Sequence, residues 1–335
     1  MRLLAGLLAS STFESVLVGD ASLRSRPMER VARPLRAMGA DVRTTDGHAP
    51  VHVRGGPLRG IRWEPEVPSA QVKGAVLLAG VAADGVTKLV EMSPTRDHTE
   101  RLLRALGASL NTHGTEIALE GPFQHAGFHG SVPGDPSSAA FLLGAAALTG
   151  GSIRVREISV NPTRLQFLEV LRRMGLEVVI GTDRDEVGEP IGSVTLASGA
   201  APRPVEVPED ELPLVVDEVP MLAIVAAYAG GPSRFRGAGE LRVKESDRLT
   251  AVRDGIGALG GRVDVDGDDL VVHGGGLHGG TTPPTDDHRV AMALTVGALA
   301  ARTPSRIAGI GSAAVSFPGF VPLLRSLGAE LEVEG

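Results

Sequence analysis

Apolar positions along the chain repeat one pattern five times, an amphipathic helix that ends at a glycine and is followed by extended residues. The five segments are 31–42, 99–110, 167–178, 251–263 and 321–333, with glycines at Gly39, Gly107, Gly175, Gly260 and Gly328. Three of the four intervals between these glycines are 68 residues and the other is 85, which indicates a structural repeat. Each glycine follows the last apolar residue of its helix, so we predict a left-handed C-cap there.

A second, more apolar helix rich in alanine and leucine precedes each amphipathic one. These helices are predicted at residues 3–8, 71–83, 138–148, 219–228 and 289–301. Helices that are apolar nearly all round belong in the interior. Alternating residues after each glycine predict strands, such as 262–266 and 270–273 joined at Gly267. The sequence therefore predicts an α/β (α+β) fold with helices inside and sheets outside.

The repeats predict two domains, residues 1–133 with about two units and residues 134–335 with three. The first unit starts directly on its apolar helix, without the capping turn that other units have, such as 133–137. We interpret this as a chain, or a gene model, shortened at its N-terminus; a naturally divergent start is the alternative. The longer interval carries an acidic, proline-rich insertion at 184–213, which we expect to be a surface excursion.

Composition narrows the class of protein. The 335 residues include 33 basic and 40 acidic side chains, a formal charge of −7, 3% aromatic residues and no cysteine. Acidity and few aromatic residues argue against a nucleic-acid-binding protein, and the lack of cysteine excludes disulfides, thiolate zinc sites and a cysteine nucleophile. We find no signal peptide and no apolar run of the ~18 residues that a membrane span needs. We therefore predict a cytoplasmic protein without a membrane partner, and we expect a monomer.

Charged and polar residues recur just before the helices of the repeated unit. They are Arg26, Ser93 with Arg96, Arg164 and 244–248 before the amphipathic helices, and 69–71, 217–218 and 287–289 before the apolar ones. In a quasi-symmetric fold these loops gather at equivalent ends, so we expect several arginines to converge on one cleft. Helix N-termini and guanidinium groups both favour carboxylate and phosphate. The pattern predicts small, multiply anionic ligands, although any single arginine is more readily explained by a solvated face or an ordinary ion pair.

Acid and base candidates lie in the same loops. They are Asp217, Glu218, Glu245, Asp247, Asp287 and His288. The alternatives are that Asp217 simply caps its helix, that Ser246 or Asp247 caps the next one, and that Glu245 forms a local ion pair with Lys244. The nine histidines show no metal-ligand spacing, so we predict no metal. Glycine clusters match neither dinucleotide nor Walker motifs, no GxSxG is present, and we predict no cofactor.

Four motifs together resemble the 5-enolpyruvylshikimate-3-phosphate synthase (EPSP synthase) family of the shikimate pathway. They are KESDR at 244–248, DDHRVAMA at 286–293, SAQVK at 69–73 and SRPM at 25–28, and the similarity runs from Met1 to SFPGF at 316–320. The resemblance implies a two-domain inside-out α/β barrel of βαβαββ units that closes over its substrates at a hinge. It also implies a transferase that joins shikimate 3-phosphate and phosphoenolpyruvate by addition and elimination, with release of phosphate.

The resemblance assigns roles residue by residue. Asp217 resembles the residue that handles the proton of the shikimate 5-hydroxyl, and Glu245 the one that protonates the methylene carbon of phosphoenolpyruvate. The shikimate 3-phosphate contacts would be Ser69, Ala70, Gln71, Arg96, Asp217 and Lys244, and those to phosphoenolpyruvate would be Arg26, Gln71, Arg248 and Arg289.

The chain departs from the family pattern in three places. The family's N-terminal Lys-Ser…Arg motif has no counterpart, nor does the family's glycine-rich turn before Met1 and Arg2, and Val315 stands where some members carry lysine. We therefore expect this chain alone to have little or no synthase activity, an expectation that a full-rate phosphate-release assay would contradict.

Two other functions compete with this interpretation. UDP-N-acetylglucosamine enolpyruvyl transferase shares the fold, but it often carries a mobile-loop cysteine that this chain lacks, and KESDR with DDHR favours the shikimate enzyme. A non-catalytic anion-binding remnant, or a ring-like repeat scaffold, would tolerate alanine at both Asp217 and Glu245.

Overall fold

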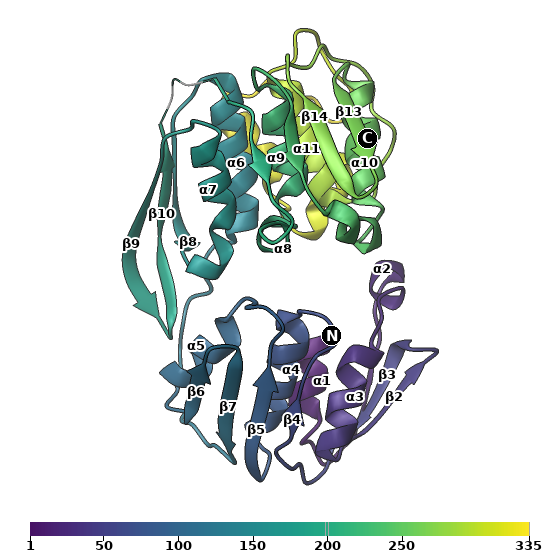
Figure 1. Ribbon diagram of the computed structural model, residues 1–335, viewed down its shortest axis with the longest axis vertical. Coiled ribbons are helices and arrows are strands. Elements are labelled where there is room, and N and C mark those ends of the chain that lie inside the picture. Colours follow the sequence, from purple (N-terminus) through teal and green to yellow (C-terminus); the bar gives the residue numbers. More distant parts are fainter. Residues whose placement is uncertain (198, 200, 335) are drawn as a thin grey trace. The chain divides into compact units, whose positions relative to one another are not determined.

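The computed structural model describes residues 1–197, 199 and 201–334. The chain divides into two compact units. Unit 1 comprises Met1–Ser131 together with Asp185–Glu189, and unit 2 comprises Val132–Arg184 and Pro190–Gly335. Within each unit, apolar helices lie on the inner side of β-sheets (Figure 1), as the sequence predicts.

The interior of unit 1 is built from α1 (Arg2–Leu8) and α4 (Ala70–Gly80). They pack closely because Gly6 has no side chain: a Cβ there would lie 2.1 Å from the carbonyl oxygen of Ala75. Eight of the eleven residues of α4 are buried. The amphipathic helices α3 (Glu29–Met38) and α5 (His98–Ala105) pack against α4.

Two sheets complete unit 1. The first has the order β1-β3-β2, with β1 (Glu14–Leu17), β2 (Asp41–Thr45) and β3 (His48–Arg54), and the short helix α2 (Ala21–Arg24) follows β1. The second has the order β4-β5-β7-β6, with β4 (Arg62–Trp63), β5 (Gly85–Val90), β6 (Leu110–His113) and β7 (Glu116–Gly121). Alternate residues of β3, including Val51 and Val53, point into the core.

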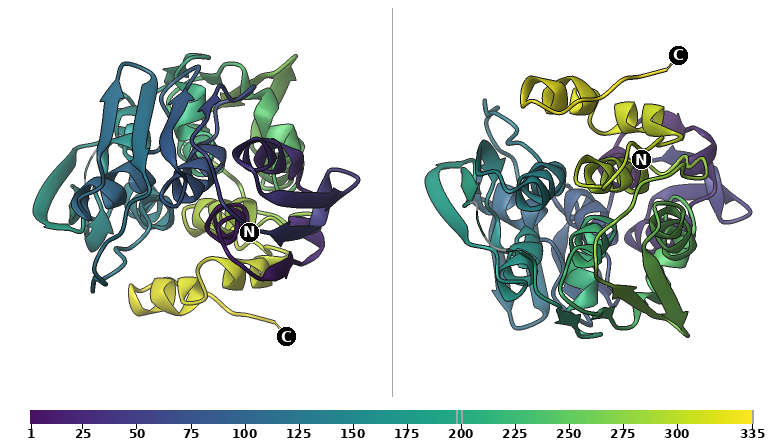
Figure 2. Two further views of the ribbon diagram at one scale, coloured as in Figure 1. Left: turned by 90° about the horizontal axis from the view of Figure 1, so that it is seen from below. Right: turned by 90° about the horizontal axis from the view of Figure 1, so that it is seen from above.

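Three helices form the interior of unit 2: α6 (Pro136–Thr149), α9 (Val219–Ala227) and α11 (His288–Leu299). Each packs on the other two, and all nine residues of α9 are buried. The C-terminal helix α12 (Phe320–Ser326) lies at the margin of the unit (Figure 2). It is anchored by Phe320, whose ring meets that of Phe141 edge-on at 6.0 Å between centroids.

The outer elements of unit 2 are two sheets, of order β8-β10-β9 and β11-β12-β14-β13, with further helices. The strands are β8 (Ile153–Ser159), β9 (Val178–Glu186), β10 (Glu189–Leu196), β11 (Glu206–Val207), β12 (Ser233–Phe235), β13 (Arg262–Asp266) and β14 (Asp269–His273). The helices are α7 (Gln166–Arg173), α8 (Leu212–Val215) and α10 (Arg248–Ala258), with 3₁₀ turns η1 (Pro162–Arg164), η2 (Ala238–Val243) and η3 (Ile310–Val315).

The repeat predicted from the sequence is present in the backbone. The five repeat glycines have positive φ, at +113° for Gly39, +92° for Gly107, +85° for Gly175, +77° for Gly260 and +98° for Gly328. The predicted left-handed caps are therefore confirmed. Glycine is favoured at such positions because other L-residues are strained there.

The prediction that residues 184–213 form a surface excursion is wrong. Strand β10 of this segment is the middle strand of the sheet β8-β10-β9, and Ile191, Val194 and Leu196 are fully buried. The insertion thus supplies part of the core.

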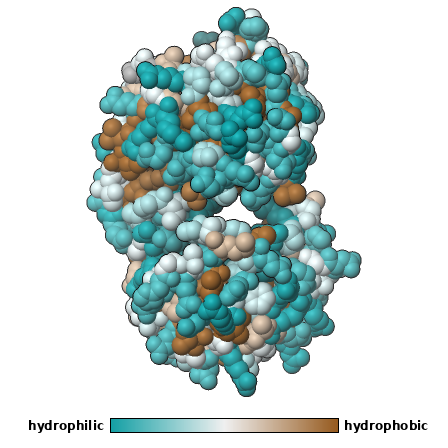
Figure 3. Space-filling view, viewed as in Figure 1, coloured by the Kyte–Doolittle hydropathy of each residue, from teal (hydrophilic) through white to brown (hydrophobic). Residues whose placement is uncertain are grey.

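Hydrophilic residues predominate on the face of the molecule shown in Figure 3. None of the helices in the described residues is long and apolar enough to cross a membrane.

Candidate functional site

The amino ends of the three central helices of unit 2 lie together. Asp135 and Asp287 are the N-caps of α6 and α11, and their carboxylates accept backbone N–H bonds from the first helical turn. Glu218 is the N-cap residue of α9, and it accepts a hydrogen bond from the hydroxyl of Ser137 on α6. Arg289 on α11 donates to the backbone oxygen of Asp217, at 3.3 Å. One end of the helix bundle therefore carries several carboxylates beside the helix N-termini.

Arg248, the first residue of α10, contacts three carboxylates, those of Asp287, Glu245 and Asp217. Its side chain is fully buried. Nε lies 2.7 Å from Oδ2 of Asp287, and Nη2 lies 2.5 Å from Oε2 of Glu245. Nη1 lies 3.6 Å from Oδ1 of Asp217, which is an ion-pair distance rather than a hydrogen bond. Among the described residues Nη1 has no hydrogen-bond acceptor, and the atom itself is buried, so the ion pair with Asp217 is its closest described polar contact.

Both predicted catalytic carboxylates keep some exposure while they contact this buried cation. The side chains of Asp217 and Glu245 are 20% and 25% exposed, against 1% for Arg248. Each carboxylate is thus held by the guanidinium and remains open to a small molecule. This combination suits proton transfer, which needs a fixed group within reach of substrate.

The capping alternatives separate in the structure. Asp247 is the N-cap of α10 and accepts the N–H of Thr250 at 3.0 Å, as one alternative predicted. The N-cap position of α9 belongs to Glu218 rather than Asp217. The third alternative was an ion pair between Glu245 and Lys244. In the structure Lys244 pairs with Glu240 at 2.9 Å, and Glu245 pairs with Arg248 at 2.5 Å.

Arg289 also lies at this end of unit 2, and its guanidinium is not neutralised by a carboxylate among the described residues. It is half-buried, and in the part of the chain that the structure describes it forms no ion pair. Its charge reaches the other helix starts. Burial alone would raise the pKa of Asp135, but Arg164, the N–H of Ser137 and Arg289 together hold that pKa below its ordinary value. Burial, and then Arg289, lower the pKa of the neighbouring His288, which favours a neutral imidazole.

The predicted residues of unit 1 lie at the start of α4 and in the loop after β5. Ser69 is the N-cap of α4, and its hydroxyl accepts the N–H of Val72 at 3.4 Å. Gln71, in the first turn, is exposed. Arg96 is half-buried in the loop that leads into α5. The loop and the helix start are joined by the side chain of Lys73, which donates to the backbone oxygen of Thr95 at 3.3 Å.

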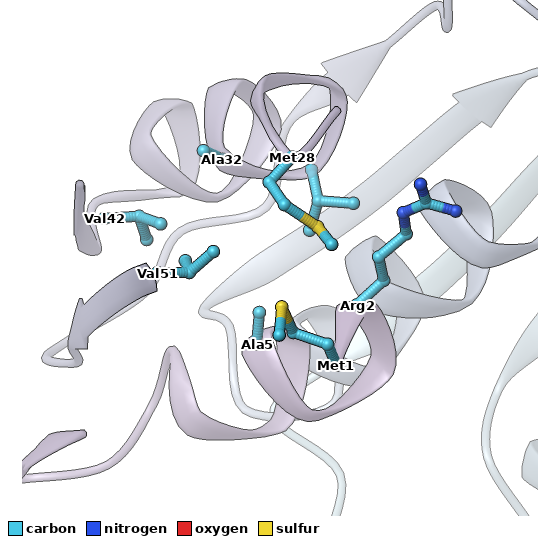
Figure 4. Close-up of a pocket in the computed structure, with 8 residues that line it drawn as sticks. Met1, Arg2, Ala5, Met28, Ala32, Val42 and Val51 are labelled. Carbon is cyan, nitrogen blue, oxygen red and sulfur yellow. The ribbon is translucent and has the colours of Figure 1, made fainter. Parts of the chain in front are cut away.

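Arg26 belongs to a cluster of arginines in unit 1. Burial, and then the charges of Arg30 and Arg26, lower the pKa of Arg2, which shows that three cations lie near one another. Arg2 points its guanidinium away from a small apolar cavity lined by Met1 and Met28 among others (Figure 4). Such a cluster favours an anion.

Within each unit the structure thus brings predicted residues together. Asp217, Glu245, Arg248 and Arg289 share one end of unit 2, while Ser69, Ala70 and Gln71 share a helix start in unit 1. The role of Asp287 as the main partner of Arg248 was not predicted, although its place in DDHR marked it as a candidate acid. Arg2 and Lys73 were also missed, and the scarcity of lysine was the available signal for the second.

Known proteins resemble this chain over nearly its whole length. The family model for EPSP synthase (3-phosphoshikimate 1-carboxyvinyltransferase) matches residues 1–324. A 3-phosphoshikimate 1-carboxyvinyltransferase of Acidithiobacillus ferrooxidans is 45% identical over 334 residues, which cover 99% of this chain and 77% of that protein. The protein of the same name from Halorhodospira halophila is 47% identical over 339 residues, covering 100% of this chain and 76% of the relative.

Solved structures agree with the sequence comparisons. An EPSP synthase from Acinetobacter baumannii superimposes with a TM-score of 0.90 at 41% identity, covering 100% of this chain and 78% of that one. The enolpyruvyl transferase NikO from Streptomyces tendae has a TM-score of 0.75 at 23% identity, which supports the fold alone.

Proposed function

Because the chain belongs to the EPSP synthase family, we propose how its own residues take part in the family's reaction. That reaction transfers the enolpyruvyl group of phosphoenolpyruvate to the 5-hydroxyl of shikimate 3-phosphate and releases phosphate. The UDP-N-acetylglucosamine enzyme is not favoured, because the relatives at about 45% identity carry the shikimate enzyme's name.

Asp217 and Glu245 are the proposed proton-transfer residues. In the addition step the 5-hydroxyl oxygen bonds to C2 of phosphoenolpyruvate, its proton passes to the carboxylate of Asp217, and C3 takes a proton from Glu245. In the elimination step Glu245 removes a proton from the same carbon, the double bond re-forms, and the C2–O bond to phosphate breaks while the proton held by Asp217 passes to the departing phosphate. Each carboxylate therefore acts as both acid and base over the cycle, which is general acid–base catalysis.

The shared partner, Arg248, is proposed to set the charge of Glu245. A guanidinium at 2.5 Å favours the ionised carboxylate, whereas donation to a carbon requires the protonated acid. An anionic substrate group that pairs with Arg248 would weaken its hold on Glu245 and so favour protonation. Substrate binding would thereby prepare the acid for the addition step.

The anions of the two substrates are proposed to bind at the cations and helix starts described above. Arg289 and Arg248, with Arg26 and Gln71, would hold phosphoenolpyruvate. Ser69, Ala70, Gln71, Arg96, Asp217 and Lys244 would hold shikimate 3-phosphate. A helix start provides N–H donors for phosphate oxygens, and arginine adds a bidentate fork.

The single observation that carries the proposal is that one buried guanidinium contacts both Asp217 and Glu245. Calorimetric titration with shikimate 3-phosphate tests the ligand assignment. We expect binding by the wild-type chain, at least about tenfold weaker binding by Arg96→Gln, and unchanged binding by Arg104→Gln, which removes another arginine from the next helix. Binding of UDP-N-acetylglucosamine in place of shikimate 3-phosphate would contradict the assignment.

We also propose that the protein is a monomer, that it is located in the cytoplasm, and that its two domains divide between residues 133 and 134. Sedimentation of the purified chain at micromolar concentration tests the first, since a stable dimer would sediment at twice the mass.

A further inference from the structure

Lys73 is one of only three lysines in the chain, and it is almost completely buried, at 2% exposure. It lies on α4, two residues after Gln71. Its Nζ atom lies 2.7 Å from Oε1 of Glu100, 3.2 Å from Oε2 of Glu91 and 3.3 Å from the backbone oxygen of Thr95. An ammonium group has three donors, so these three acceptors use all of them. Lys73 therefore has no donor left for a ligand.

The three acceptors come from three places around the loop that carries Arg96. Glu91 directly follows β5, Thr95 directly precedes Arg96, and Glu100 lies in the first turn of α5. The hydroxyl of Thr95 also donates to Glu91. The ammonium on α4 thus contacts the residue before this loop, the loop itself and the helix after it, and so links all three to α4.

A contribution to stability explains this cluster poorly. Glu91 and Glu100 are 9% and 4% exposed at their side chains, so two carboxylates and one cation are withdrawn from water together. Within the described residues Oε2 of Glu100 has no hydrogen-bond partner, and burial raises the pKa of this carboxyl. Well-packed apolar residues in place of a buried ion cluster are often neutral or stabilising. What the charged cluster adds is a defined geometry for the loop.

We propose that Lys73 is a positioning residue: it holds the Thr95–Arg96 turn at the amino end of α4, so that Arg96 is placed beside Ser69 and Gln71 for the phosphate of the substrate. The inference rests on the proposed role of those three residues in binding shikimate 3-phosphate. Lys73 does not touch the substrate; it acts through the backbone of Thr95.

The test uses the double variant Lys73→Met/Glu100→Gln, which removes the ammonium and one carboxylate together and leaves Glu91 with the hydrogen bond from the hydroxyl of Thr95. Lys88→Met is the matched control, because Lys88 pairs with Glu116 at the surface of the same unit. We expect the double variant to melt near the wild-type temperature, to bind shikimate 3-phosphate at least about tenfold more weakly, and to bind phosphoenolpyruvate unchanged. Amide hydrogen exchange in residues 93–97 should be faster without any ligand.

The outcomes separate this inference from the proposed function. If the wild-type chain does not bind shikimate 3-phosphate, the ligand assignment fails, and amide exchange alone decides whether Lys73 holds the turn. Wild-type affinity together with unchanged exchange in the double variant would overturn the inference, and so would a lower melting temperature with wild-type affinity. If the double variant does not fold, Lys73→Arg takes its place, with the same selective loss of affinity expected and unchanged affinity overturning the inference.

Discussion

The Nε atom of Arg248 lies 2.7 Å from Oδ2 of Asp287, and both side chains are withdrawn from solvent, at 1% and 0% exposure. The same carboxylate caps α11 through the N–H groups of Arg289 and Val290, and it accepts a hydrogen bond from Ser246. The pair therefore joins the starts of α10 and α11. It also fixes the guanidinium that contacts Asp217 and Glu245.

Asp287→Asn should destabilise unit 2. An amide cannot replace the carboxylate on both sides, because one of its two polar atoms is a donor that would face either Arg248 or the helix N–H groups. Removal of one partner from a buried ion pair costs about 3–5 kcal/mol, and we expect the lower part of that range because Glu245 still contacts Arg248. Urea unfolding measures the loss. The control Asp254→Asn removes an exposed partner of Arg253 and should change stability by less than about 0.5 kcal/mol; equal stability of the two variants would contradict the account.

Arg289→Gln should weaken phosphoenolpyruvate binding. This arginine forms no ion pair within the described residues, so its charge is available to an anion, and loss of a charged contact of this kind costs about 2–5 kcal/mol of binding. Calorimetric titration with phosphoenolpyruvate measures the change. Arg253→Gln on α10 removes an equal charge at the surface and should bind as the wild type does. Identical affinities in the two variants would remove Arg289 from the ligand set.

Glu29 gives unit 1 a pH-dependent stability. Hydrogen bonds from Arg36 and then Thr44 hold the pKa of its carboxyl at about 2, below the ordinary 4.5. A depressed native pKa stabilises the fold at pH values above about 4.5, and this contribution is lost as the pH falls toward 2. The side chains of Glu29 and Arg36 are both about 40% exposed, so we expect this ion pair to add at most about 1 kcal/mol to the free energy of unfolding.

Urea unfolding of Glu29→Gln between pH 7 and pH 2.5 tests this dependence. The variant should be less stable than the wild type at pH 7, and the difference should shrink below pH 4.5. A difference that is constant with pH would show that the charge of Glu29 is not its cause.

Local patterns predicted much of the fold. The five glycines fixed the helix ends because a positive φ is a property of one residue, and the apolar stripe Leu249, Val252, Ile256 and Leu259 is buried as its spacing predicts. The place of β10 in the middle of its sheet depends on pairing with β8 and β9. Acidic and proline-rich composition concealed that long-range contact.

The sequence predicted which residues belong to the site but not which of them form ion pairs. Motifs marked Asp217, Glu245, Arg248 and Arg289. The burial of Arg248 depends on carboxylates from three separate segments, which no single motif contains. Lys73 shows the same limit, since Glu91 and Glu100 reach it from outside its helix. Residue type and spacing indicate which groups are available, and tertiary packing decides which of them meet.

The most direct measurement of the proposed mechanism is single-turnover release of phosphate, with the chain in excess over phosphoenolpyruvate and shikimate 3-phosphate present. With the chain in excess even the low rate expected of this chain is measurable; relative to that rate, Asp217→Asn and Glu245→Gln should each slow release at least about a hundredfold, the usual size of a general acid–base contribution, while Asp254→Asn should match the wild type. Phosphate release at the wild-type rate by both carboxamide variants would contradict the roles assigned to the two carboxylates.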